Sequence, residues 1–284
     1  MGKLGHSGGL TRAALLMALS GLTACGGGGD VELTFTGLVG EAPAACGQSY
    51  DGIGTSGTSM TLADFRLYVH DLRVVRADGT EVPVTLEQDG VWQHENVALL
   101  DFEDGTAGCE NGTAELNTSI RGTVEESGPF TAVRFRLGVP FALNHADVST
   151  APSPLGFPSM FWNWNGGYKH LRIDGRTTGQ PDGFRIHLGS TGCDGDERGN
   201  VTMCTADNRP EIELALDPDT QGIRVDVAAL LSQSDMDTDM GGMPGCMSGP
   251  TDPECEQIFG GLGLPFGGGT AGTQRLFVPT APPR

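Results

Sequence analysis

Histidines are the residues of this chain best suited to metal chemistry, because neutral imidazole binds copper and zinc. His70, His145, His170 and His187 lie in separate segments, and no pair has the HxH or HxxxH spacing of a local metal site. A metal site would therefore be assembled from distant strands. Asp147 follows His145 by two residues and is a candidate to orient the His145 ring.

Two of the three tryptophans lie in the segment FWNWNGGYKHLRI, residues 161–173. In a strand Trp162 and Trp164 would share one face, and the following Asn-Gly-Gly predicts a tight turn. A three-residue loop would bring Tyr168 and His170 onto the face of the indoles, whereas a two-residue loop would bring Lys169 and Leu171 there. The indoles could be core residues, bind a ligand, or be oxidised themselves.

Residues 234–255 combine four methionines with an Asp-x-Asp-x-Asp run. Thioethers suit Cu(I) and carboxylates suit Ca²⁺. The glycine expected in an EF-hand loop is displaced by one position, and Cys246 stands where the closing glutamate belongs. We therefore expect an acidic surface loop.

The N-terminus has the features of an export signal. Lys3 and Arg12 precede an apolar run over residues 13–22, which is too short to span a bilayer as a stable helix. The run ends in Leu-Thr-Ala-Cys, the pattern at which bacterial lipoprotein signals are cleaved. We expect residues 1–24 to be a lipoprotein signal peptide, Cys25 to be lipidated, and residues 25–29 to be a glycine-rich tether.

This prediction places the mature protein in the periplasm or at the cell surface, held to the outer membrane only by its lipid. Removal of residues 1–24 leaves 15 basic and 36 acidic residues, a net charge of −21. Such an acidic protein is not expected to bind nucleic acid, whereas metal ions and cationic partners suit it.

Six cysteines remain after Cys25. An even number in an exported chain indicates three disulfides. We favour pairing between nearest neighbours, which gives Cys46–Cys109, Cys193–Cys204 and Cys246–Cys255.

Short segments with period-two alternation, separated by Gly, Asp and Pro, are typical of half-buried strands. Such segments occupy residues 31–40, 64–75, 130–139, 169–174, 184–189, 211–216 and 222–227. Short helices are expected over residues 226–233 and 252–264. The fold class is therefore all-β: an antiparallel sandwich or barrel with long disulfide-stapled loops and one or two short helices, forming one domain over residues 30–284.

Motifs of common enzymes are missing from the sequence. It contains no GxSxG, P-loop, HExxH or dinucleotide-binding fingerprint. We therefore expect a protein that is not an enzyme.

Several segments together resemble the MbnP-like copper-binding family, also called the metallo-mystery pair four-cysteine family. They follow one another in order over nearly all of residues 30–284: LYVHDLRVV (67–75), WQHENVALLDFEDGTAGC (92–109), FRLGVPFALNHADV (135–148), MFWNWNGGYKHLRID (160–174), FRIHLGSTGC (184–193) and GCMSGPTDPECEQIFGGLGL (245–264).

The resemblance implies an exported copper protein, often a lipoprotein, that is paired with a di-haem cytochrome c peroxidase-like partner. In the family this partner oxidises a tryptophan of the copper protein to kynurenine. The matching positions imply that His145 and His187 are copper ligands and that Trp162 or Trp164 is oxidised. His170 and His70 are further candidate ligands, with Asp147 and Tyr168 beside the site.

The alternative hypothesis is an envelope lipoprotein that binds a glycan or another metal-free ligand through exposed aromatic residues. A hydrolase is a third hypothesis, which lacks a recognisable nucleophile or acid–base motif.

Overall fold

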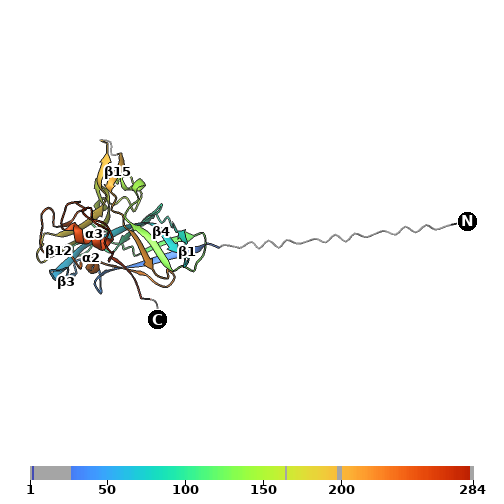
Figure 1. Ribbon diagram of the computed structural model, residues 1–284, viewed down its shortest axis with the longest axis horizontal. Helices are drawn as coiled ribbons and strands as arrows, with labels where there is room; N and C mark the ends of the chain where they lie inside the picture. Colours follow the sequence, from blue (N-terminus) through green and yellow to red (C-terminus); the bar gives the residue numbers. More distant parts are fainter. Residues whose placement is uncertain (1, 3–26, 164, 197–199, 282–284) are drawn as a thin grey trace.

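The computed structural model describes residues 2, 27–163, 165–196 and 200–281. Cys25, Trp164 and all of the predicted signal peptide except Gly2 lie outside the described residues. Two β-sheets dominate the fold and pack face to face, as Figure 1 shows. The predicted all-β class is confirmed.

The smaller sheet has six strands and contains the start of the domain. Its path is β19 (Phe277–Pro279), β17 (Ile223–Asp226), β1 (Gly29–Val39), β9 (Ser119–Val124) and β6 (Thr85–Leu86), with β2 (Ala42–Pro43) paired to β1. Strand β1 already includes Gly29, which was predicted to be the last tether residue. Strand β19, near the end of the described chain, pairs antiparallel with β17.

The larger sheet has eleven strands. Its path is β16 (Glu211–Ala215), β10 (Ala132–Leu137), β4 (Thr58–Val75), β12 (Gly167–Thr177), β13 (Phe184–Gly189) and β18 (Gly245–Cys246). Branching from it are β3 (Ser49–Ile53), β5 (Glu81–Pro83), β7 (Gln93–His94), β8 (Val97–Asp101) and β11 (Phe161–Asn163). Strand pairing is mostly antiparallel, as predicted, but β1 pairs with β17 and β13 pairs with β18 in parallel.

Alternating apolar residues of the two sheets form the core. The rings of Phe35, Phe135 and Phe277 meet edge to face between the sheets, with centroids 6.2 and 5.2 Å apart. A second cluster forms around Tyr68 and Tyr168, on the outer side of the larger sheet. This outer layer matters for function because β11 and the candidate histidines belong to the same side of the molecule.

Helices are few and short. They are α1 (Phe141–Asn144), the 3₁₀ helix η1 (Pro158–Met160), α2 (Val227–Leu231) and α3 (Cys255–Leu262). Asp226 caps α2 by accepting hydrogen bonds from the backbone N–H groups of Ala228 and Ala229, and Gly263 ends α3 with a left-handed φ of 79°. Within the part of the chain that the structure describes, no helix has the length and apolarity needed to cross a membrane.

A separate hairpin of β14 (Thr191–Gly195) and β15 (Val201–Ala206) projects from the sandwich (Figure 1). One of the three disulfides, Cys193–Cys204, joins its strands. The others are Cys46–Cys109 and Cys246–Cys255, so the predicted pairing is confirmed.

Candidate metal centre

The turn after the tryptophans resolves the alternatives that the sequence left open. Asn163 pairs with Gly167, so the loop between them has three residues, 164–166. Phe161, however, pairs with Tyr168, and the register shifts by one between these pairs. Trp162 is the extra residue of this bulge and therefore lies over β13 rather than beside Tyr168.

His187 lies on β13, and its neighbours in the strand point to the opposite face. The side chains of Phe184, Ile186 and Leu188 are buried in the main core, as the alternation predicted. His187 is also buried, because the other face of β13 is covered. Its Nε2 lies 2.6 Å from Oδ1 of Asp174, a residue of β12.

Asp174 is held in turn by a guanidinium. Arg172 donates to Asp174 Oδ2 from Nε at 2.9 Å and from Nη2 at 2.7 Å. Arg172 is itself held by the Ser159 carbonyl, 3.1 Å from Nη1, and by Asp64, 3.2 Å away. The orientation of the His187 ring is therefore set by a buried chain of charged groups.

The protonation states in this chain follow from burial and charge. Burial lowers the pKa of His187, although the hydrogen bond to Asp174 opposes this effect. Burial alone would raise the pKa of Asp174, but hydrogen bonds from His187 and Arg172 outweigh it and lower the pKa to about 2. At neutral pH we therefore assign a neutral imidazole beside an ionised carboxylate.

This assignment fixes the tautomer of His187. A carboxylate only accepts hydrogen bonds, so Nε2 carries the proton and Nδ1 carries a lone pair. His187 Nδ1 is buried and has no hydrogen-bond partner among the described residues. A buried polar atom without a partner is costly, and a histidine with a carboxylate on its other nitrogen is the usual arrangement of a metal ligand.

Trp162 covers this site. Its ring centroid lies 6.4 Å from that of His187, at an interplanar angle of 51°. The indole also lies directly on Gly189, where a Cβ atom would come within 2.4 Å of Cζ3 of Trp162. Trp162 is partly exposed and lines a surface pocket of about 310 Å³ together with Met247 and Cys193. An external oxidant can therefore reach it.

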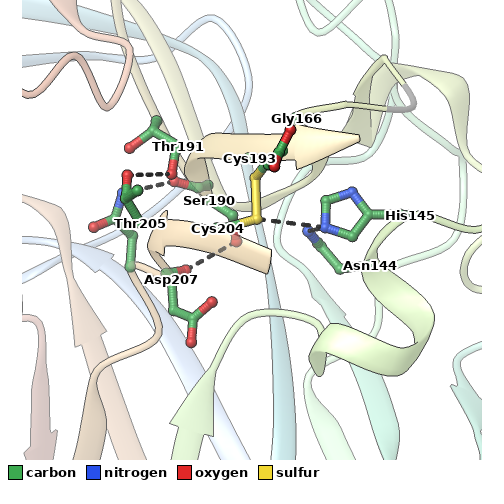
Figure 2. The surroundings of a disulfide bond; sticks show 12 residues. Asn144, His145, Gly166, Ser190, Thr191, Cys193, Cys204, Thr205 and Asp207 are labelled. Atoms are coloured by element: carbon green, nitrogen blue, oxygen red, sulfur yellow. Dashed lines mark hydrogen bonds between the residues drawn. A yellow bond between two sulfur atoms is a disulfide. The ribbon is translucent and has the colours of Figure 1, made fainter. Parts of the chain in front are cut away.

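His145 approaches the same pocket wall from another element. It follows the last residue of α1, and its Nε2 lies 3.6 Å from Sγ of Cys204, as Figure 2 shows. Cys204 is bonded to Cys193, which lines the pocket of Trp162. The buried side chain of Asn144 lies 3.2 Å from the same nitrogen through Nδ2.

The two other candidate ligands occupy structural positions. His170 is fully buried, with Nδ1 3.1 Å from the Asn208 carbonyl oxygen and Nε2 3.3 Å from Oδ1 of Asn144. His70 Nδ1 lies 2.8 Å from the Gly138 carbonyl oxygen. Burial lowers the pKa of His170 to about 3 and that of His70 to about 4, so both are neutral. Both ring nitrogens of His170 and the Nδ1 of His70 therefore have hydrogen-bond partners within the protein.

The predicted neighbours of the site also have other roles. Tyr168 is buried, and its hydroxyl donates to the Leu155 carbonyl at 2.6 Å, while burial raises its pKa to about 12. Asp147 accepts hydrogen bonds from the backbone and hydroxyl of Ser149 in a turn. Sequence proximity suggested Asp147 as the partner that orients His145, whereas the structure places Asn144 at the His145 ring.

Within the described ranges, two groups of His, Cys, Asp and Glu place three potential ligand atoms within 4.8 Å of one another. They are His145 with Cys193 and Cys204, and Glu103 with Cys46 and Cys109. Both include a disulfide, whose sulfurs are not thiolates. Neither group includes His187. The imidazoles of His187 and His145 are each of a type that binds copper, and each would need further donors to complete a site.

Three residues important for this geometry were not identified from the sequence. Asp174 contacts the His187 ring from the neighbouring strand, and Gly189 leaves room for the Trp162 indole. Asn144 contacts β12 at the point where α1 approaches that strand. Asp174 lies on the same face of the sheet as His187. The alternation of residues in β12 could therefore have indicated that Asp174 lies near His187.

Comparisons with known proteins agree with this architecture. The MbnP family model matches residues 28–248. Among solved structures, MbnP from Methylosinus trichosporium superposes with a TM-score of 0.77 at 29% sequence identity, over 89% of this chain and 99% of that chain. No curated protein matches the chain. This chain is therefore a member of the MbnP family.

Proposed function

We propose that this protein binds copper after export and that Trp162 is oxidised to complete the copper site. His187 carries the proposal: its Nδ1 is buried without a partner among the described residues, its Nε2 is held by Asp174, and its ring lies against Trp162. His145 is the second proposed ligand. Copper would supply a soft or borderline centre that imidazole nitrogens bind well.

Oxidation would convert the indole of Trp162 to kynurenine. In this conversion the indole C2–C3 bond breaks, each of these carbons takes an oxygen from water, and four electrons and four protons are released. The electrons pass to a di-haem peroxidase-like partner, which uses them and the protons to reduce two molecules of hydrogen peroxide to water. Hydrolysis of the resulting formamide then releases formate. The product has a ketone and an aromatic amine where the indole had only an N–H donor. These groups are the further donors that the two histidines lack. Trp164 is the competing candidate for the same oxidation.

The remaining features fit a protein that is the substrate of this oxidation rather than an enzyme. A lipid on Cys25 would hold it at the outer membrane, facing the periplasm or the cell surface. Its mature charge of −21 would attract a partner with a basic docking surface.

Coexpression with a di-haem peroxidase-like partner tests the proposal. We expect the intact mass to show the exchange of one carbon for one oxygen, and peptide mapping to place it at Trp162. The Trp162→Phe variant should lose the change, whereas Trp92→Phe, which alters a ring stacked on Phe157, should retain it. Copper retained after dialysis should fall in His187→Ala and, by about 10–100-fold in affinity, in Asp174→Asn.

An unmodified mass together with no copper retained by the wild type would overturn the proposal. A modification mapped only to Trp164 would overturn the assignment of Trp162.

Glycan binding is the second candidate function, favoured by the pocket that places Trp162 beside Asn165 and Thr191. Stacking of a sugar on the indole with hydrogen bonds from amide and hydroxyl groups would use this surface. Glycan binding that persists in the presence of a chelator would support it.

A further inference from the structure

His145, Cys193 and Cys204 bring three potential ligand atoms within 4.8 Å of one another. The cysteines are directly opposite in the β14–β15 hairpin, and the histidine comes from the end of α1, as Figure 2 shows. The Cys193–Cys204 bond masks two thiolates that would otherwise face an imidazole. We propose that reduction of this disulfide opens a second metal site, made of Cys193, Cys204 and His145, for a soft monovalent cation such as Cu(I).

Distances in the oxidised protein already suit this site. A metal bound to sulfur at about 2.3 Å and to nitrogen at about 2.0 Å with tetrahedral angles would separate these ligand atoms by about 3.5 Å. His145 Nε2 lies 3.6 Å from Cys204 Sγ. Once reduced, the two sulfurs would need to separate to about 3.8 Å. Rotation of two side chains on a two-stranded hairpin can supply this movement.

The His145 ring is held in place for this role. Asn144 is fully buried and has its Oδ1 facing the Tyr168 N–H and His170 Nε2, so its Nδ2 points at His145 Nε2. An amide N–H₂ only donates, so Nε2 is the unprotonated nitrogen, and its lone pair accepts from Asn144 at a point 3.6 Å from Cys204 Sγ. The ring also packs edge to face on Phe141, with centroids 5.3 Å apart. A metal ion bound to the two opened sulfurs would take this lone pair in place of the hydrogen bond from Asn144.

The three disulfides differ in access. Cys193 and Cys204 are both partly exposed and lie in a hairpin outside the two main sheets. Each of the others includes a buried cysteine: Cys109 in one and both Cys246 and Cys255 in the other. Thiol–disulfide exchange requires access of an attacking thiolate to a sulfur. Cys193–Cys204 is therefore the bond that an external dithiol reduces first.

The redox step balances with a dithiol as the reductant. The Cys193–Cys204 bond takes up two electrons and two protons, and the reductant, a dithiothreitol-like or thioredoxin-like dithiol, becomes a disulfide. Cu(I) then displaces the thiol protons as it binds the sulfurs. Reoxidation by thiol–disulfide exchange with an external disulfide, which becomes a dithiol, would restore the Cys193–Cys204 bond and release the cation, so the redox state of this pair controls the site.

This inference goes beyond the proposed function, because it requires neither oxidation of Trp162 nor binding by His187. It shares only His145 with the first site. Soft thiolates select Cu(I), whereas the imidazole site in the oxidised protein also suits Cu(II). The two sites can therefore be tested in different redox states of the same chain.

The test starts with anaerobic treatment of the protein with limiting dithiothreitol, followed by alkylation and mass spectrometry. We expect label on Cys193 and Cys204 before any other cysteine. Titration of unalkylated, reduced protein with Cu(I) against a chromogenic chelator should show additional high-affinity Cu(I) per chain relative to the oxidised protein. Bound Cu(I) should protect both thiols from alkylation, and His145→Ala should weaken binding by about tenfold or more.

The Cys193→Ser/Cys204→Ser double variant is the matched control, and it should bind Cu(I) like the oxidised wild type. Earlier labelling of another cysteine pair, or equal Cu(I) binding by reduced and oxidised wild type, would overturn the inference. Cu(II) binding by the oxidised protein forms a separate arm that reports only on the first site, so failure of either proposal is visible independently. Because the main comparison is between two redox states of one chain, it does not depend on a variant that folds poorly.

Discussion

At the scale of single residues, His187 acquires its character from neighbours that are distant in sequence or on another strand. Asp174 accepts a hydrogen bond from His187 Nε2, Arg172 balances the charge of Asp174, and Trp162 covers the ring. None of these side chains alone would indicate a metal ligand. Together they leave one buried nitrogen without a partner in the described structure, which is the property that a metal ion would satisfy.

Gly189 is predicted to be essential for the position of Trp162. In Gly189→Ala the new Cβ would overlap the indole, with 2.4 Å to Cζ3, and would lie 3.0 Å from the Tyr168 carbonyl oxygen. We expect a loss of about 1–3 kcal/mol in the free energy of unfolding and a shift in tryptophan fluorescence. Gly260→Ala is the control, because nothing lies within 4 Å of its Cβ position in α3. It should be neutral or stabilise by about 0.5–1 kcal/mol. Equal effects of the two variants in urea unfolding would refute the close-contact argument.

His70 is predicted to make stability depend on pH. Burial lowers its pKa to about 4, whereas the unfolded side chain has a pKa of about 6.5. The unfolded chain therefore binds the proton first, and the stabilising contribution is fully present above about pH 6.5 and is lost as the pH falls toward 4. Urea unfolding at several pH values should show a shallower slope in His70→Gln than in the wild type. A wild-type slope in His70→Gln would contradict the prediction.

At the scale of elements, short irregular segments position the site on a regular scaffold. The bulge in β11 turns Trp162 toward β13, and the single turn of α1 ends with Asn144 inserted against β12. The β14–β15 hairpin brings a disulfide to the same pocket. Each segment is too short to be stable alone, so its conformation depends on the larger sheet beneath it.

Asn144 is predicted to hold α1 against β12. Its side chain lies within 3.3 Å of the Tyr168 N–H, His170 Nε2 and His145 Nε2, and it is fully buried. Asn144→Ala would leave these groups without their partner, so we expect a loss of about 1–3 kcal/mol or more in the free energy of unfolding. The exposed Asn165→Ala should change it by less than about 0.5 kcal/mol. Chemical denaturation of both variants gives the comparison, and an Asn144→Ala variant as stable as Asn165→Ala would rule out the anchoring role.

At the scale of the whole molecule, charge is the dominant property. The full chain carries a net charge of −19, and many of its arginines are engaged in ion pairs, such as Arg73 with Glu81 and Arg134 with Glu213. The excess of carboxylates therefore remains as a negative field around the sandwich. Such a field favours approach of a cationic docking surface over that of nucleic acid.

Association with the proposed haem partner should therefore weaken with salt. Because the Debye length falls from about 30 Å at 0.01 M to about 10 Å at 0.1 M, we expect the association rate to fall by about tenfold or more over this range. Stopped-flow measurements with increasing NaCl provide the check, with the dissociation rate expected to change less. An association rate that does not depend on salt would show that charge does not steer the encounter.

Much of the fold could be predicted because its signals are local. Alternation in β1, β4, β13 and β17 follows from each strand having one face on the core. Helix α3 and its glycine cap also follow local rules. Strand direction is different: the parallel pairing of β1 with β17 depends on residues nearly two hundred positions apart, which no local pattern encodes.

The candidate site shows the same contrast between what local sequence signals predict and what tertiary contacts decide. Residue types identified four histidines and the tryptophan pair as chemically capable, and the family resemblance singled out His145 and His187. An even cysteine count with nearest-neighbour pairing predicted the three disulfides that the described structure contains. Tertiary structure alone decided that His170 and His70 are bonded to backbone or amide oxygens, that Asn144 faces His145, and that Trp162 covers His187. The physical reason is that donor chemistry belongs to a side chain, whereas the availability of its lone pair depends on which groups from other strands satisfy it.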